Sequence, residues 1–199
     1  MAINITKDYF KVDIELPKGN YDSLDEYISV FKKECLIYLL GYELYSLVME
    51  AAALEAPAVP AVPGDPGTPE IPAVEIPEPY KSFIKGAEYT VNGHKIKWEG
   101  LVNAEKRSLI AYYIYCEYRR NTVTSTQVVG ETIGVAENSR QANVFAKLFN
   151  AWNKFEELYG YAGQDELAPS AYNYLLTNQS DFPEWVFTEL KGSINSHDL

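Results

Sequence analysis

Few residues of this chain have the types and spacing that metal or phosphate chemistry requires. His94, His197, Cys35 and Cys116 are the chain's histidines and cysteines, and they lie too far apart to form a metal-ligand motif. The segment GETIG, residues 130–134, has the glycines of half a phosphate-binding loop, but no Lys-Ser or Lys-Thr follows it. The sequence therefore predicts no metal and no cofactor.

Nucleophiles and acid–base pairs are equally sparse. Ser170 lies in DELAPSAY, without the G-x-S-x-G turn of a hydrolase and without a histidine partner. Glu156–Glu157 and Asp165–Glu166 are acidic pairs, and such residues are mostly found on solvated faces. We therefore predict no catalytic residues and a protein that is not an enzyme.

The charge balance argues against nucleic-acid wrapping and the apolar pattern against a membrane. The net charge is −11, whereas phosphate neutralisation requires clustered Lys and Arg; Arg119–Arg120 is the basic pair of note. No run of 18 apolar residues exists, and the N-terminus lacks a basic stretch followed by an apolar one, so neither a membrane span nor a secretory signal is expected. Cys35 and Cys116 lie in apolar helical patterns and are predicted to be buried thiols.

A proline-rich insertion at residues 56–80 interrupts the apolar sequence. Six of its eight prolines recur every third residue, at Pro57, Pro60, Pro63, Pro66, Pro69 and Pro72. Polyproline II has three residues per turn, so the spacing predicts an extended rod, which would reach roughly 50 Å at 3.1 Å per residue. Two interpretations are open: a disordered surface insertion, or an arm that docks on a neighbouring subunit. The apolar contacts of such an arm would be Val59, Val62, Ile71, Val74 and Ile76.

The elements on either side of the insertion follow from local patterns. Residues 3–16 alternate loosely and predict an extended arm or edge strand, so residues 1–22 are assigned to an N-terminal arm. A capping box at Ser23 predicts a helix that kinks or ends at Gly41 and resumes to about Ala56. Pro79 predicts a short helix start, and Asn92-Gly93 predicts a hairpin over residues 89–98.

The helix expected over residues 103–121 has two apolar stripes. One contains Leu109, Ile110, Tyr113 and Ile114, and the second contains Tyr112, Tyr115 and Tyr118. A helix that is apolar on two sides is covered on two sides. We expect the first stripe to face the core, and we predict that the tyrosines are available to a neighbouring chain.

The remaining sequence completes a mainly α fold. Residues 122–137 predict a flexible loop or a strand that pairs only in an assembly, and a long helix is expected over residues 139–159. Two short helices are expected over residues 171–177 and 181–190, followed by a flexible tail over residues 191–199. The prediction is a helical bundle over residues 23–190, with a small β-hairpin and a long proline-rich, polyproline II-like insertion.

The order of these segments resembles a known family. LIYLLGYELY, a variable insertion, SLIAYYIYCEY, a Gly-punctuated loop and FAKLFNAWNKF follow one another as in the small α-helical head–tail connector (adaptor) proteins of tailed double-stranded DNA phages, particularly those of gut Bacteroidetes phages and prophages. The resemblance implies a virion protein, assembled in the host cytoplasm, that forms a homo-oligomeric ring. It implies portal, capsid and tail proteins as partners, and DNA that passes non-specifically through the ring.

A second function is open. The three tryptophans and many tyrosines would also suit a monomeric cytosolic module that binds a peptide or a sugar and recruits partners through its proline-rich segment. The mass in solution separates these hypotheses, because a connector forms rings or assembles on a portal and the module stays monomeric.

Overall fold

The computed structural model describes residues 3–16, 24–57, 72–127, 130–133 and 144–190. Its α-helices and strands are α1 (Leu24–Ala53), α2 (Tyr80–Lys85), β1 (Ala87–Val91), β2 (His94–Trp98), α3 (Leu109–Val123), β3 (Thr124–Gln127), β4 (Gly130–Ile133), α4 (Val144–Tyr159) and α5 (Ala171–Thr177). Three 3-10 turns complete it, η1 (Lys7–Tyr9), η2 (Val12–Ile14) and η3 (Gln179–Asp181). The expected mainly α fold with a small antiparallel hairpin is confirmed.

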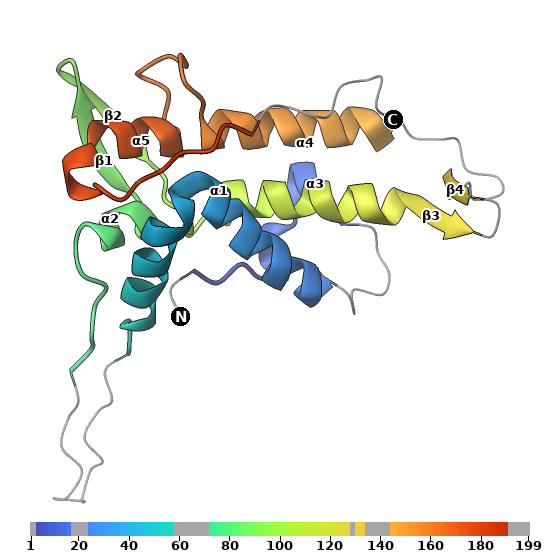
Figure 1. Ribbon diagram of the computed structural model, residues 1–199, viewed down its shortest axis with the longest axis horizontal. Coiled ribbons are helices and arrows are strands. Elements are labelled where there is room, and N and C mark those ends of the chain that lie inside the picture. The colour runs from blue at the N-terminus through green and yellow to red at the C-terminus, as the bar shows by residue number, and fades with distance from the viewer. Residues whose placement is uncertain (1–2, 17–23, 58–71, 128–129, 134–143, 191–199) are drawn as a thin grey trace, which may run out of the picture.

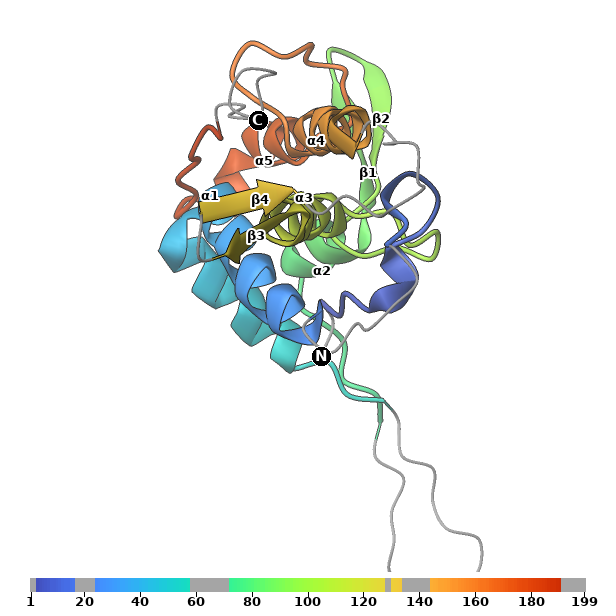
Figure 2. The ribbon, with the colours of Figure 1, turned by 90° about the vertical axis from the view of Figure 1, so that its right-hand side faces the viewer.

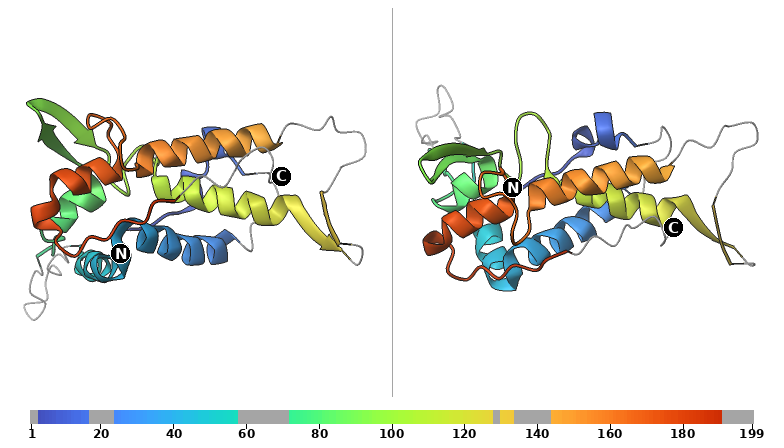
Figure 3. Two further views of the ribbon diagram at one scale, coloured as in Figure 1. Left: turned by 45° about the horizontal axis from the view of Figure 1, so that its top comes forward. Right: turned by 90° about the horizontal axis from the view of Figure 1, so that it is seen from above.

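The long helices are stacked with α3 in the middle. α3 packs against α4 on one side and against α1 on the other, as the views in Figures 1 and 2 agree. The β1–β2 hairpin and α5 lie at one end of this stack, and the β3–β4 hairpin extends from the other (Figure 3). The central position of α3 explains why this helix is apolar around most of its circumference. Every residue from Ser108 to Cys116 is buried.

The bend in α1 is at Gly41, as the sequence predicts. Gly41 has φ 73° and ψ 164°, so the helix axis changes direction there. A Cβ atom at this position would lie 3.0 Å from the Cβ of Val186, which crosses the bend. By length and composition α1 could cross a membrane, but the bend divides it and its ten buried side chains belong to the core of the domain.

The C-terminal segment crosses α1 as an extended strap. The backbone N–H groups of Val186 and Thr188 donate to the carbonyls of Leu40 and Tyr38, at 3.3 and 3.1 Å. The Trp185 indole donates to the carbonyl of Leu39 at 2.9 Å. These bonds satisfy carbonyls that the bend leaves without helical partners. The helix expected over residues 181–190 is therefore wrong, because its backbone donors bond to α1 instead.

Residues 3–16 belong to the core and do not form the expected arm or edge strand. Six of their apolar side chains are buried: Ile3, Ile5, Tyr9, Phe10, Ile14 and Leu16. The segment forms the two 3-10 turns η1 and η2 and packs along α4, where Lys147 Nζ donates to the carbonyl of Glu15 at 3.2 Å. The buried side chains are irregularly spaced, which suits short turns rather than a strand.

The β1–β2 hairpin has the expected turn. Its strands pair from Ala87 with Trp98 to Val91 with His94, and Asn92 and Gly93 have φ of 50° and 81°, as a type I′ turn requires. The buried Trp98 indole donates to the carbonyl of Phe83 at 2.8 Å, and this bond fixes the hairpin on α2.

Helix α3 begins six residues later than predicted. Asn103 Oδ1 accepts from the Arg107 N–H at 3.0 Å, and Asn103 Nδ2 donates to the Arg107 carbonyl at 2.6 Å. The Asn103 side chain thereby closes a loop over residues 103–107 that competes with helix formation. Ser108 then caps the helix, because its Oγ accepts from the Ile110 N–H at 3.2 Å.

The segment that follows α3 forms a hairpin of its own. Thr124 pairs with Ile133 and Gln127 with Gly130 in an antiparallel ladder, so neither the loop nor the strand that pairs only in an assembly describes these residues. α4 ends at Tyr159, as predicted, and α5 has the predicted bounds. Ser170 caps α5, because its Oγ accepts from the Asn173 N–H at 3.2 Å.

The two ends of the proline-rich insertion are paired with each other. The Ala56 N–H donates to the Val74 carbonyl at 3.0 Å, and the Val74 N–H donates to the Ala56 carbonyl at 2.9 Å. The Cα atoms of such a pair lie about 5.5 Å apart, so a single straight rod of roughly 50 Å between the two ends is wrong. Ion pairs also join Lys85 to Glu55 and Lys81 to Glu75 near this base.

Candidate functional site

The predicted tyrosine interface lies inside the domain. The exposed fractions are 4%, 2% and 9% for Tyr112, Tyr115 and Tyr118. Lys147 of α4 covers Tyr115, with its Nζ 5.9 Å from the ring centroid, and Tyr27 of α1 packs on Tyr118 with ring centroids 5.2 Å apart. The expectation of an available tyrosine face is therefore wrong, because α1, α4 and residues 3–16 supply the second cover of α3.

The apolar candidates of the insertion have different positions. Ile76 is 3% exposed and belongs to the core, so its assignment to an intermolecular contact is corrected. Val74 is 46% exposed at the base of the insertion, where a partner would reach it. Val59, Val62 and Ile71 lie outside the described residues.

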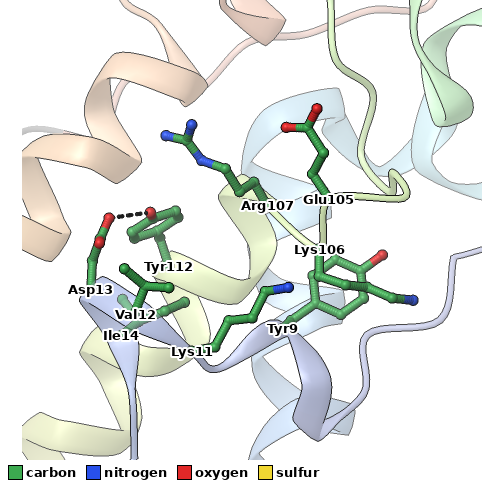
Figure 4. Close-up of a pocket in the computed structure, with 9 residues that line it drawn as sticks. All are labelled: Tyr9, Lys11, Val12, Asp13, Ile14, Glu105, Lys106, Arg107 and Tyr112. Carbon is green, nitrogen blue, oxygen red and sulfur yellow. Dashed lines mark hydrogen bonds between the residues drawn. The ribbon is translucent and has the colours of Figure 1, made fainter.

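A pocket of about 290 Å³ lies where the N-terminal segment meets the loop before α3 (Figure 4). We name it the Lys–Arg pocket, and its lining is Tyr9, Lys11, Val12, Asp13, Ile14, Glu105, Lys106, Arg107 and Tyr112. Two further hollows, of about 360 and 410 Å³, adjoin it and share Asn103 and Ala104 with each other. The residue 102–107 loop therefore forms the rim of a hollowed face of the molecule.

Each wall of this pocket contains a residue with a strained backbone. Val12 and Lys106 each have φ of 58°, a conformation that side chains rarely adopt and a β-branched residue least of all. Such a residue costs about 1–3 kcal/mol and persists when its surroundings fix it, most often at functional sites. Asn103 fixes the Lys106 wall through its two bonds to Arg107.

The pocket is cationic in a chain that is strongly acidic overall. Lys11, Lys106 and Arg107 stand against Asp13 and Glu105 in the lining, whereas the whole chain has a net charge of −11. Among the described residues, none of the three cations forms an ion pair with a carboxylate. The Lys106 ammonium instead lies over the ring of Tyr9, 5.0 Å from its centroid.

Tyr112 contributes a neutral hydroxyl to this pocket. Its O–H group donates to Asp13 Oδ2 at 2.9 Å (Figure 4). Burial and the hydrogen bond from this hydroxyl to Asp13 raise the pKa of Tyr112 to about 12, although Arg107 acts in the opposite direction. The hydroxyl therefore stays protonated at neutral pH. Because its one proton is donated to Asp13, the groups of this pocket that could bind an anion are the cations.

The other candidate reactive side chains are buried or form hydrogen bonds within the fold. Cys35 and Cys116 are free and buried, as predicted, and burial raises the pKa of both thiols, which makes them poor nucleophiles. Ser170 caps a helix, and Glu156 accepts from the Trp152 indole at 2.8 Å. Within the described ranges, no group of three or more metal-ligating side chains is positioned to hold a metal ion.

The sequence contains one signal for this pocket. Lys106 and Arg107 form a basic pair, but the helix expected over residues 103–121 contains both, and on a helix they would be ordinary surface charges. Asn103 and Ser108 are both residue types that favour caps and turns, and they mark the loop that exposes this pair. No local pattern indicates that Lys11 joins them.

The fold and the site together define a mainly α domain with a cation-lined surface pocket. No protein family, no curated protein and no solved structure matches the chain. A function is therefore proposed from the order of its segments and from the geometry of the domain.

Proposed function

We propose that the chain is a structural subunit of a phage head–tail connector, in which copies form a ring at the portal vertex and DNA passes through it. The observation that carries this proposal is the layout of the molecule. A compact stack of α1, α3 and α4 carries two appendages at different ends, the β3–β4 hairpin and the base of the insertion (Figure 1). Such a layout suits a subunit that contacts neighbours on several sides.

The charge supports passage of DNA rather than its capture. With a net charge of −11, a wall built from this chain repels phosphate and lets a duplex slide. The proposed partners are further copies of the chain and the portal, capsid and tail proteins, and the proposed location is the virion. The role is structural, with neither a catalytic residue nor a cofactor.

The insertion is proposed to be polyproline II-like and to act as an arm that contacts a neighbouring subunit, the portal or the capsid. The prolines recur every third residue, and the Ala56–Val74 pairing fixes where the insertion leaves the domain. A polyproline II segment is already extended, so ordering it against a partner costs little conformational entropy. Val74, which pairs with Ala56 at this base, is exposed and apolar.

Assembly of the full-length chain tests this proposal. The chain is produced alone and together with the products of its flanking genes, and each sample is studied by sedimentation velocity and negative-stain electron microscopy. We expect rings with a central channel, or a complex with a portal protein. A chain that stays monomeric in both samples and binds a peptide or a sugar would refute the connector and favour the monomeric module.

A further inference from the structure

We propose that the Lys–Arg pocket receives an acidic side chain of a second copy of this chain, so that copies join head to tail. This inference deepens the proposed function, because it assigns the contact between ring neighbours to one site. The closure of copies into a ring rests on the proposed function, whereas the pairing of two copies rests on the pocket alone.

The first argument is that three cations line one hollow without carboxylate partners. Lys11 comes from the N-terminal segment and Lys106 and Arg107 from the loop before α3, and Figure 4 shows them around one hollow. An arginine donates two parallel hydrogen bonds to a carboxylate, and such charge-assisted bonds are about twice as strong as neutral ones. In Figure 4 the Arg107 guanidinium and the Lys106 ammonium point to different sides of this hollow, so a single carboxylate would bind the guanidinium, and the two ammonium groups would add positive charge around it.

The second argument is that the pocket's own carboxylates do not neutralise these cations. Asp13 accepts from the Tyr112 hydroxyl at 2.9 Å and forms no ion pair with a described cation. In Figure 4 the carboxylate of Glu105 points away from Lys11 and from Lys106. The arrangement leaves a positive site for an anion that comes from outside the domain.

The third argument is the strained backbone beside each cation. Val12 follows Lys11, and Lys106 precedes Arg107, and both Val12 and Lys106 have φ of 58°. Strain of this kind is retained where it positions side chains for a ligand. Val12 is also 79% exposed, so it offers an apolar contact next to the charges.

The fourth argument identifies the source of the carboxylate. The chain has 28 acidic residues against 17 basic ones, so two copies repel unless a cationic site meets an acidic one. The contact would join two different surfaces, a pocket on one copy and a carboxylate on the next. Such a heterologous contact produces a closed ring when the rotation between copies closes.

The test compares two double charge reversals of equal net charge. Lys106→Glu with Arg107→Glu removes the site, and Lys33→Glu with Lys95→Glu is the control, because both lysines are exposed and lie outside the pocket. Sedimentation velocity is run at about 50 mM and about 1 M salt, since salt screens charge contacts. We expect the parent and the control to associate at low salt, and the pocket variant to lose at least tenfold in its association constant.

Two outcomes of this comparison would overturn the inference. A parent that stays monomeric at low salt excludes pairing of copies, and an equal loss in both variants shows general repulsion in place of a site. Thermal melting identifies a variant that does not fold, and Arg107→Gln then replaces the double reversal, with a smaller loss expected in the same direction. An unchanged association constant in a folded Arg107→Gln variant would also count against the pocket.

A second arm separates the sources of the carboxylate and the two proposals. Glutarate is titrated into the parent by calorimetry. If the parent never self-associates but binds glutarate, and Lys106→Glu abolishes this binding, the pocket binds a free small acid. That result would overturn the proposal that a second copy occupies the pocket. Rings that persist in the pocket variant refute this inference and leave the connector standing. Pocket-dependent pairs that close no ring, and that bind no portal protein, refute the connector and leave the pocket contact standing.

Discussion

Replacement of Tyr115 by alanine measures whether the tyrosines of α3 belong to the core. Tyr115 is 2% exposed, so nearly its whole side chain is buried. An aromatic side chain buries about 150–250 Å², which at about 25 cal/mol per Å² gives an upper value near 4–6 kcal/mol. Measured losses for large aromatic core residues are about 3–5 kcal/mol, and we expect about 3–4 for this tyrosine because its hydroxyl is polar.

Urea denaturation followed by circular dichroism measures this loss. Domains have a total unfolding free energy of about 5–15 kcal/mol, so Tyr115→Ala should move the urea midpoint by a large fraction of its value. Tyr42→Ala is the matched control, because Tyr42 also lies on a helix but is 71% exposed. We expect the control to change the unfolding free energy by less than about 0.5 kcal/mol.

The opposite pattern would refute the core assignment. If Tyr115→Ala left the urea midpoint of the parent unchanged and abolished self-association, the tyrosine would be an interface residue. Equal losses for Tyr115→Ala and Tyr42→Ala would show that the cost arises from the helix and not from burial.

Three further predictions concern other parts of the fold. Gly100→Ala should cost about 2–5 kcal/mol, because its Cβ would meet the Gly86 backbone nitrogen at 2.5 Å, whereas Gly93→Ala, with positive φ but open space, should cost only about 1–2 in the same urea assay; equal costs would contradict the close approach. Ile76→Ala should cost about 2–5 kcal/mol and Val74→Ala under about 1, and the reverse order in thermal melts would place Ile76 at the surface. Burial raises the pKa of Tyr89 to about 12, so the stability that its neutral form contributes is complete below about pH 10 and is lost as the pH rises through 12. Tyr89→Phe should reduce this loss of stability in unfolding curves measured at pH 8–11. If the stabilities of the parent and the variant fell in parallel with pH, this prediction would be refuted.

The elements that were predicted correctly depend on neighbouring residues. Asn92 and Gly93 specify a tight turn wherever they occur between alternating residues, and Gly41 breaks a helix through its own backbone. Ser170 caps α5 through a bond to a residue three positions away. Patterns of this range are visible in the sequence itself.

The elements that were predicted wrongly depend on contacts between distant segments. Residues 3–16 bury α3 from about a hundred positions away, as the bond between Asp13 and Tyr112 illustrates. The strap over residues 182–190 lacks helical bonds because Val186 bonds to Leu40. The Lys–Arg pocket is difficult to predict for two reasons. It joins distant segments, and it requires Val12 in a left-handed conformation that no residue propensity favours.

The pairing of Ala56 with Val74 makes the insertion a replaceable part of the gene. Because its ends already lie one strand spacing apart, residues between them can be lengthened, shortened or exchanged without moving a core element. The boundary is sharp, since Ile76 belongs to the core and the Pro77 carbonyl accepts from the Lys81 N–H at 3.1 Å. Mutation and recombination can therefore change this segment without changing the core of the domain. A reporter or affinity tag placed there would leave the domain intact.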